Sequence, residues 1–219
     1  MNYKATNTME VEISSRKRWE KEYHNWNRVT LPTLSENIYI GGYPTSFWKF
    51  IINQKITIGI QLAQFYESYH LQVDSPLLNL DDKSIIILQS EERMNEDLVH
   101  RVYKIEHDNE QWILHHFDFQ WPDLGVPERS SFELLLNQYY QVVDDHSNMF
   151  VHCFGGHGRS GTFVLTLALI ANQDKSHSTP RQLLQLLRNQ RFGAVETTKQ
   201  ERFADIFSQY YKSQHGLSI

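Results

Sequence analysis

The sequence of 219 residues contains one cysteine, Cys153, six scattered prolines and no long hydrophobic run. A single cysteine excludes a disulfide framework within the chain and a zinc site built from several cysteines. No run of roughly 18 apolar residues occurs, so no membrane span is predicted, and the N-terminal residues lack the apolar core of a signal peptide. We therefore expect a protein of the reducing cytoplasm, with export into a host cell as an open alternative.

Basic charge is also scarce, since 21 Lys and Arg residues face 26 Asp and Glu residues, for a net charge of −5. Nucleic-acid binding depends on neutralising phosphates, so it is not expected here. Apolar and aromatic residues are plentiful, at 40% and 13% of the composition, which is too much for a disordered chain. The length favours a single domain, which we place over residues 27–219.

An N-terminal extension, residues 1–26, is predicted to precede this domain. Within 11–25, Trp19 and Tyr23 are four residues apart, which places both rings on one face of a helix. A surface helix that docks by these rings is the favoured interpretation. A basic patch for a partner or a membrane surface is the alternative.

The pattern of apolar residues predicts a mixture of strands and helices. Strands are predicted over 56–62, 84–88, 98–106, 112–119 and 149–152, where β-branched and other apolar residues cluster. Helices are predicted over 130–143, 161–171, 180–189 and 200–214, with Ser130 or Ser131 near the N-cap of the first and Thr179 as the N-cap of the third. This mixture predicts an α/β (α+β) fold with a central mixed, twisted sheet flanked by helices.

Residues 152–160 read His-Cys-Phe-Gly-Gly-His-Gly-Arg-Ser and connect a predicted strand to a predicted helix. A tight loop at such a junction directs several backbone N–H groups at one point, beside the positive end of the helix dipole. Three glycines remove Cβ atoms that would obstruct the turn, and Arg159 can contact two phosphate oxygens at once. The loop therefore predicts a phosphate site. The expected contacts are Phe154, Gly155, Gly156, His157, Gly158 and Arg159.

Cys153 stands at the base of this loop, where the same N–H groups and dipole favour a thiolate that can attack phosphorus. Ser160 is expected to donate a hydrogen bond to the sulfur, and His152 to orient the loop from behind. A lone cysteine is more often a small buried hydrophobic residue. That interpretation does not account for Arg159 six residues later or for the glycines between them, so the nucleophile is favoured.

These residues resemble the active-site loop of the cysteine-dependent protein tyrosine phosphatases, and the Ser-Gly-Thr-Phe of 160–163 continues the similarity. Trp-Pro-Asp-Leu-Gly-Val-Pro at 121–127 resembles the mobile acid loop of that family, and 188–200 resembles its glutamine-containing loop. The resemblance implies a phosphatase-type active-site loop between a strand and a helix. It also implies that no metal or other cofactor is needed, because Arg159 and the backbone dipoles supply the charge.

The resemblance implies a two-step hydrolysis in which Cys153 attacks phosphorus while Arg159 stabilises the transition state. Asp123 would protonate the leaving oxygen and then accept a proton from water. Gln200 would position that water. The residues expected to support this machinery are His152, Trp121, Pro122, Arg191 and Glu196, of which Arg191 is expected to brace the loop.

Several residues depart from the family pattern. Asn27-Arg28 is followed by Val29, where tyrosine-specific members have a tyrosine whose ring deepens the pocket, and Tyr39 or Tyr43 could take its place. Glu196 stands where the family commonly has its first glutamine, so its carboxylate should either point away or slow turnover. The segment 36–42 also resembles the smaller dual-specificity phosphatases.

Three functions therefore stay open. The leading expectation is a phosphatase that acts on phosphotyrosine in proteins, with dual specificity as a variant of it. A cationic His157 would favour the alternative of a phosphoinositide or other non-protein phosphatase. A degenerate phosphotyrosine-binding module is the third. A metal site at His115 and His116 is not expected, because neighbouring side chains of a strand point to opposite faces.

Overall fold

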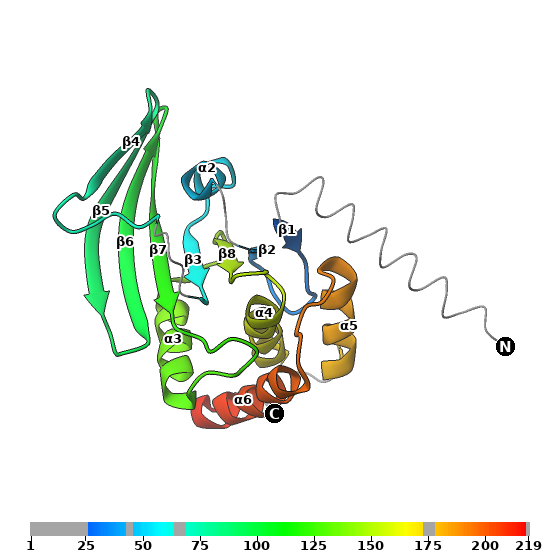
Figure 1. Cartoon of the computed structure of the whole chain (residues 1–219). Helices are drawn as coiled ribbons and strands as arrows, with labels where there is room; N and C mark the ends of the chain where they lie inside the picture. The colour runs from blue at the N-terminus through cyan, green and yellow to red at the C-terminus, as the bar shows by residue number, and fades with distance from the viewer. Residues whose placement is uncertain (1–25, 43–45, 64–68, 173–177, 218–219) are drawn as a thin grey trace.

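The computed structural model describes residues 26–42, 46–63, 69–172 and 178–217, so the helix predicted over 11–25 lies outside the described residues. One eight-stranded mixed sheet runs through the described part, with helices on both faces (Figure 1). The strands are β1 (Trp26–Val29), β2 (Asn37–Gly41), β3 (Ile58–Gln61), β4 (Leu77–Asp81), β5 (Ser84–Arg93), β6 (Leu98–His107), β7 (Glu110–Phe119) and β8 (Asn148–His152). The helices are α2 (Phe47–Asn53), α3 (Arg129–Val142), α4 (Gly158–Ala171), α5 (Pro180–Gln190) and α6 (Thr198–His215).

The strand order is β1-β2-β8-β3-β7-β6-β5-β4. The strands β2, β8, β3 and β7 are parallel neighbours, whereas β7, β6, β5 and β4 form an antiparallel meander that projects from the body in Figure 1. Because β8 lies between two parallel strands and is covered on both faces, its residues Met149–Val151 form a continuous apolar run. The predicted mixed sheet with flanking helices is confirmed.

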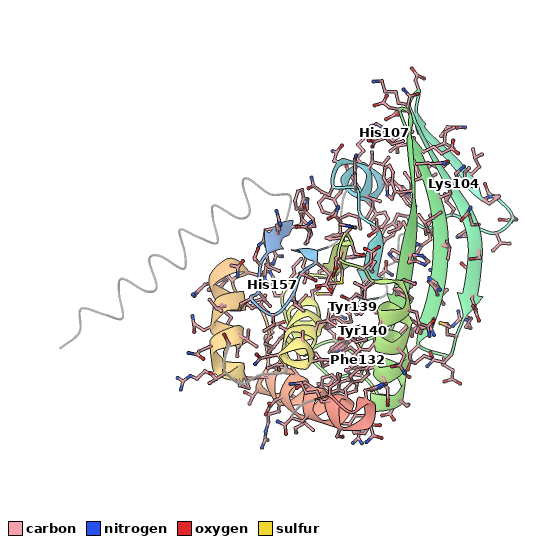
Figure 2. All side chains as sticks on the ribbon, turned by 180° about the vertical axis from the view of Figure 1, so that it is seen from behind. Lys104, His107, Phe132, Tyr139, Tyr140 and His157 are labelled. Carbon is pink, nitrogen blue, oxygen red and sulfur yellow. The ribbon has the colours of Figure 1, made fainter. Side chains whose placement is uncertain are left out.

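Two apolar cores fill the faces of the sheet. On one face α2 packs against the sheet through its buried aromatic and aliphatic residues. On the other face α3, α4, α5 and α6 surround a larger core, in which α4 is central and almost entirely buried. Phe132 and Tyr139 of α3 point into this core, where both rings contact Phe163 of α4 (Figure 2). An apolar helix of this kind is expected only where neighbours cover every side of it.

The starts of α3, α4 and α6 differ from the sequence predictions, and α6 begins at Thr198 rather than at residue 200. The helix α3 starts at Arg129 with Glu128 at the N-cap, so Ser130 and Ser131 lie near the cap, in the first turn, and neither is the cap itself. The Ser131 hydroxyl instead donates to the Asp97 carboxylate at 2.7 Å. The helix α4 starts at Gly158 rather than at residue 161, because the end of the glycine-rich loop already forms its first turn. The cap at Thr179 is confirmed, as a capping box with Gln182.

Four elements were not predicted from the sequence: β1, β2, β4 and α2. The strand β4 lies at the edge of the sheet and three of its five residues are exposed, so it lacks a strong apolar run. The strand β1 is four residues long and is the other edge. It begins at Trp26, the last residue assigned to the N-terminal extension. Short edge strands carry a weak sequence signal because one partner and one covered face are enough to hold them.

Candidate active site

The glycine-rich loop leaves β8 at His152 and enters α4 at Gly158. Cys153 is only 3% exposed, and its Sγ accepts a hydrogen bond from the backbone N–H of Gly156 at 3.2 Å. Gly156 has a φ of +70°, and a Cβ there would lie 2.2 Å from the carbonyl carbon of Gly41. Only glycine fits this turn. The turn therefore directs a backbone N–H at the sulfur, as the sequence predicted for the loop.

A pocket of about 480 Å³ opens over Cys153. The active-site loop, the segment after Trp121 and the segment before α6 all contribute to it. Its described lining residues are Ala63, Asp123, Leu124, Cys153, Phe154, Gly155, His157, Gly158, Arg159, Glu196 and Gln200. The structure thus brings together residues from the three sequence segments singled out above, although they are up to 77 positions apart (Asp123 to Gln200).

Asp123 and Arg159 meet at this pocket. A guanidinium nitrogen of Arg159 lies 3.1 Å from the Asp123 carboxylate, and the other donates to the carbonyl of Trp121 at 3.2 Å. The Asp123 side chain is 78% exposed, so water screens the two charges and the ion pair is weak. Trp121, by contrast, is buried and its ring packs against Phe132 and Phe203. Exposed Pro122 separates this anchor from the carboxylate, so the acid loop is buried at Trp121 and exposed at Asp123, where the ion pair with Arg159 is its side-chain contact.

Arg191 lies behind the loop and is 2% exposed. Its guanidinium donates to the carbonyls of Gly156 at 2.9 Å and Gly155 at 3.2 Å, and to the side-chain oxygen of Asn27 at 3.1 Å. Burial lowers the pKa of Arg191 to about 10, and the nearby Cys153 opposes this shift, so Arg191 stays charged at neutral pH. By holding two loop carbonyls at the back, this side chain keeps the opposite N–H groups turned toward the pocket.

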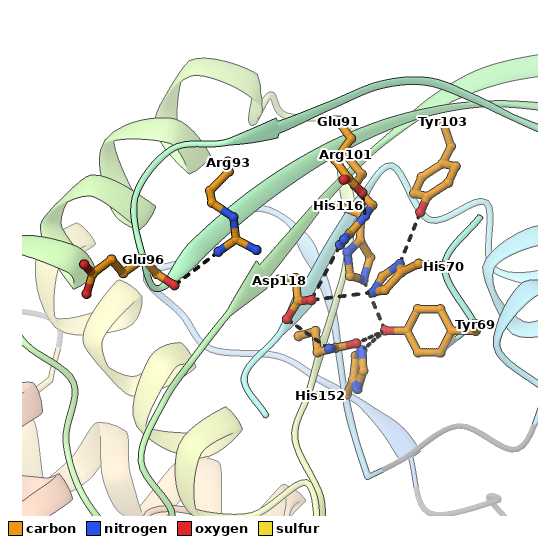
Figure 3. Close-up of polar contacts among 11 residues, drawn as sticks. Tyr69, His70, Glu91, Arg93, Glu96, Arg101, Tyr103, His116, Asp118 and His152 are labelled. Atoms are coloured by element: carbon orange, nitrogen blue, oxygen red, sulfur yellow. Dashed lines mark hydrogen bonds and ion pairs between the residues drawn. The ribbon is translucent and has the colours of Figure 1, made fainter. Parts of the chain in front are cut away.

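His152 is also fully buried behind the loop. Its Nε2 lies 2.7 Å from the hydroxyl of Tyr69, and the same hydroxyl lies 3.2 Å from Nε2 of His116 (Figure 3). The amide of Gln61 bonds both to this hydroxyl and to Asp118, which extends the network across β3 and β7. Burial lowers the pKa of His152 to about 3, so its imidazole is neutral.

His115 and His116 do point to opposite faces of β7. His116 is buried in the network behind the loop, whereas half-buried His115 lies 3.1 Å from the ring nitrogen of His100. Sequence reasoning considered the two histidines only as a metal pair and missed both Tyr69 and the structural role of His116. Within the described ranges, no three His, Cys, Asp or Glu side chains are grouped in a way that could hold a metal ion.

Ser160 is buried at the start of α4, and its Oγ makes no hydrogen bond with any described residue. The hydrogen bond predicted from Ser160 to Cys153 is therefore not formed here. His157 occupies the turn before α4 (Figure 2), and its Nδ1 lies 2.7 Å from the carbonyl of Phe192. Since a carbonyl only accepts, Nδ1 carries the hydrogen, and His157 links the active-site loop to the segment before α6.

Gln200 is buried and serves first as a helix cap. Its side-chain oxygen accepts from the backbone N–H groups of Glu196 at 3.0 Å and Thr197 at 3.2 Å, and its amide nitrogen lies 3.4 Å from the Gly125 carbonyl. The last contact joins α6 to the acid loop. Sequence reasoning treated Gln200 as a catalytic residue and did not foresee the capping box, which Thr197 and Gln200 at the third helical position could have indicated.

Glu196 faces the active-site loop, so the alternative that it points away is wrong. Its carboxylate oxygen lies 2.9 Å from where a Cβ on Gly158 would stand, and it lines the pocket. The preceding Val195 has a φ of +61°, which is rare for a β-branched residue, and its N–H donates to the His157 carbonyl at 3.3 Å. This strained backbone holds Glu196 against the loop.

Tyr39 does not replace the tyrosine whose ring would deepen the pocket. The Tyr39 ring packs against Trp26 and Phe50, with centroids 6.0 Å and 5.7 Å away, and does not line the pocket. The prediction that Tyr39 could take this place is wrong, and Tyr43 lies outside the described residues.

Comparisons with known proteins agree on one family. The family model described as protein-tyrosine phosphatase matches residues 2–205. Among curated proteins, the chain is similar to tyrosine-protein phosphatase 2 of Dictyostelium discoideum, at 28% identity over 72% of this chain and 46% of that protein. It is also similar to human tyrosine-protein phosphatase non-receptor type 2, at 30% identity over 84% of this chain and 49% of that protein. The chain thus spans about half the length of the curated relatives it matches.

The fold has solved counterparts as well. A structure of PTPN18, solved in work on HER2 tyrosine phosphorylation sites, superposes with a TM-score of 0.75 at 21% identity, over 89% of this chain and 76% of that chain. The Trypanosoma brucei protein tyrosine phosphatase TbPTP1 superposes with a TM-score of 0.74 at 22% identity, over 90% of this chain and 75% of that chain. At these identities the similarity establishes the fold.

Proposed function

Because this chain belongs to the protein-tyrosine phosphatase family, we propose that it removes phosphate from phosphotyrosine in proteins through a cysteinyl-phosphate intermediate. The observation that carries the proposal is the convergence of Cys153, Arg159 and Asp123 on one pocket. The relatives are named tyrosine-protein phosphatases, and the structure of PTPN18 concerns tyrosine phosphorylation sites. Both support a phosphotyrosyl protein as the substrate.

The first step forms a sulfur–phosphorus bond. The thiolate of Cys153 attacks phosphorus, the bond from phosphorus to the tyrosine oxygen breaks, and Asp123 gives its proton to that oxygen. Arg159 and the loop N–H groups stabilise the charge on the other phosphate oxygens. In the second step, water attacks phosphorus, the thiolate leaves, and the proton of the water passes to Asp123. The residues of the chain are then as they began.

Two buried side chains have a place in the second step. Ser160 has a hydroxyl without a partner among the described residues, so it can donate to the departing thiolate of Cys153. The side-chain oxygen of Gln200 caps α6. Its amide hydrogens lie beside Gly125, where they can position the water. Both are roles in turnover rather than in substrate binding.

The two alternatives have weaker support. A phosphoinositide carries several phosphates, and the carboxylate of Glu196 lines the same pocket as Arg159, which disfavours a highly anionic substrate. A binding module would have no use for a nucleophile and an acid in one pocket. A cytoplasmic location fits the proposed chemistry, because the thiol of Cys153 must stay reduced to act.

The proposal is tested by phosphate release from a phosphotyrosyl peptide, a phosphoseryl peptide of the same sequence and a phosphoinositide. We expect the phosphotyrosyl peptide to be hydrolysed fastest. In the Cys153→Ser variant, kcat should fall by more than about 10⁴-fold with unchanged thermal stability, because the nucleophile is gone. Faster hydrolysis of the phosphoinositide, or activity that survives Cys153→Ser, would contradict the proposal.

A further inference from the structure

Phe154 is the most exposed large apolar residue among those described, at 72%. It stands between Cys153 and Gly155, in a loop that binds phosphate through backbone N–H groups. The phenyl ring of Phe154 is therefore not needed for phosphate binding. The ring also takes no part in the core, since it belongs to neither apolar cluster. A single exposed ring is common at protein surfaces, so Phe154 indicates a ligand only together with a second exposed apolar residue of the same pocket.

A second exposed apolar residue lines the same pocket. Leu124 is 55% exposed and directly follows Asp123 on the acid loop. The third apolar residue of the lining is Ala63, which is short and almost fully buried. Among the described lining residues, Phe154 and Leu124 are therefore the side chains that offer apolar surface to a ligand, one from each loop that carries a reacting group.

The substrate proposed above brings an apolar group to this position. The phosphate of phosphotyrosine must reach Cys153, and its ester oxygen must reach Asp123, so the phenol ring leaves the pocket between the two loops. The tyrosine that contacts this ring in the family is replaced by Val29, and Tyr39 is packed elsewhere. A phosphoseryl side chain has no ring to present there.

We propose that Phe154 is the ring-binding residue of this pocket, packing on the phenol ring of phosphotyrosine with Leu124 on the acid-loop side, and that it selects aryl over alkyl phosphate esters. This inference rests on the proposed function and adds the source of its specificity. Two aromatic rings in contact bury apolar surface and gain from edge-to-face or offset stacking. The contact acts on the ring alone, so it should not alter the affinity for phosphate itself.

The test measures binding in the Cys153→Ser background, where turnover does not interfere. The three probes, studied by calorimetry, are a phosphotyrosyl peptide, the phosphoseryl peptide of the same sequence, and inorganic phosphate. Phe154→Ser should lower the affinity for the phosphotyrosyl peptide about 10-fold, as expected for loss of one ring contact. The same change should leave the affinities for inorganic phosphate and for the phosphoseryl peptide within about twofold of those of the parent protein. Phe154→Tyr, which keeps a ring, should restore the wild-type affinity.

Val73→Ser is the matched control, since Val73 is 69% exposed and lies outside the pocket lining. It should change no affinity. The inference is overturned if Phe154→Ser leaves the phosphotyrosyl peptide unaffected, or if it weakens inorganic phosphate to the same degree, which would make Phe154 a support of the loop. Wild-type protein that fails to hydrolyse the phosphotyrosyl peptide overturns the proposed function as well. Normal hydrolysis with an unaffected Phe154→Ser variant overturns the inference alone.

Discussion

The two sides of the active-site loop differ in how firmly their side chains are held. Behind the loop, Arg191 and His152 are buried and hydrogen-bonded to groups within the protein. In the pocket, Asp123 is mostly exposed, and at the start of α4 the buried hydroxyl of Ser160 has no hydrogen-bond partner among the described residues. The back therefore fixes where the backbone N–H groups lie, while the pocket keeps its reacting groups free to change partners. Preorganisation of the loop and movement of the acid can then coexist.

Among variants that keep Cys153, the largest effect is expected on the pocket side, from Arg159→Lys. Lysine keeps the positive charge but loses the planar pair of donors that can contact two phosphate oxygens, so kcat should fall by at least about 10³-fold. Steady-state kinetics on a phosphotyrosyl peptide measure the change. Arg202→Lys, at an exposed position of α6, is the matched control and should stay within about twofold of wild type. A small effect of Arg159→Lys would mean that the backbone alone binds the transition state.

Asp123→Asn comes next. The amide cannot protonate the leaving oxygen, so kcat on a phosphotyrosyl peptide should fall about 10²-fold. The loss should be smaller on 4-nitrophenyl phosphate, whose leaving group needs less protonation, and comparison of the two substrates is the measurement. Glu128→Gln, an exposed carboxylate at the N-cap of α3, serves as the control. Equal losses on both substrates would show that Asp123 does not act as the acid.

On the back of the loop, Arg191→Met should affect stability more than chemistry. It leaves the carbonyls of Gly155 and Gly156 and the side chain of Asn27 without a donor, which should lower the free energy of unfolding by about 2 kcal/mol. Urea unfolding measures this change. The loosened loop should also lower kcat about 10-fold. Arg191→Lys keeps the charge but has fewer donors, so its free energy of unfolding and its kcat should lie between those of the wild type and of Arg191→Met. Unchanged kcat with lost stability would show that the brace does not reach the pocket.

The smallest effect concerns pH. Burial lowers the pKa of His116 far below 6.5 and that of His152 to about 3, so both stay neutral in the folded protein while the unfolded chain takes up protons below about pH 6.5. The free energy of unfolding should therefore fall as the pH drops from about 7 to 5. His116→Phe removes one such histidine and should reduce the slope by up to about 1.4 kcal/mol per pH unit, a limit approached only well below pH 6.5.

Urea unfolding at several pH values measures this slope. His146→Gln, at an exposed histidine in the connection between α3 and β8, is the control and should leave the slope unchanged. Tyr69 still has Gln61 and His152 as partners in the His116→Phe variant, so the back of the loop should remain intact. A slope unaffected by His116→Phe would show that this side chain takes up a proton in the folded protein.

Prediction from the sequence succeeded where the relevant residues are adjacent along the chain. The strand 148–152, the glycine-rich loop and the start of α4 are consecutive, so their residue types alone indicated a loop of N–H groups with Cys153 inside it. Thr179 was found as a cap for the same reason. Residues with roles that depend on distant partners were missed or misread. Tyr69 is 83 positions from His152, and Gln200 has its cap and its acid-loop contact in different parts of the chain.

The sequence by itself determined the local residue pattern of this protein: a cysteine at the base of a glycine-rich turn, an arginine six residues later, and Asp123 and Gln200 on further segments. Only the tertiary structure decided that Tyr69 and His116 lie behind that turn beside His152, and which side chains remain exposed at its mouth. The reason is that β8 pairs with β2 and β3, and β3 pairs with β7. These strands are far from β8 along the chain, so the pattern of residues around β8 does not indicate which side chains will contact it. Packing across the sheet buried His152 with Tyr69 and His116 and left Phe154 in water.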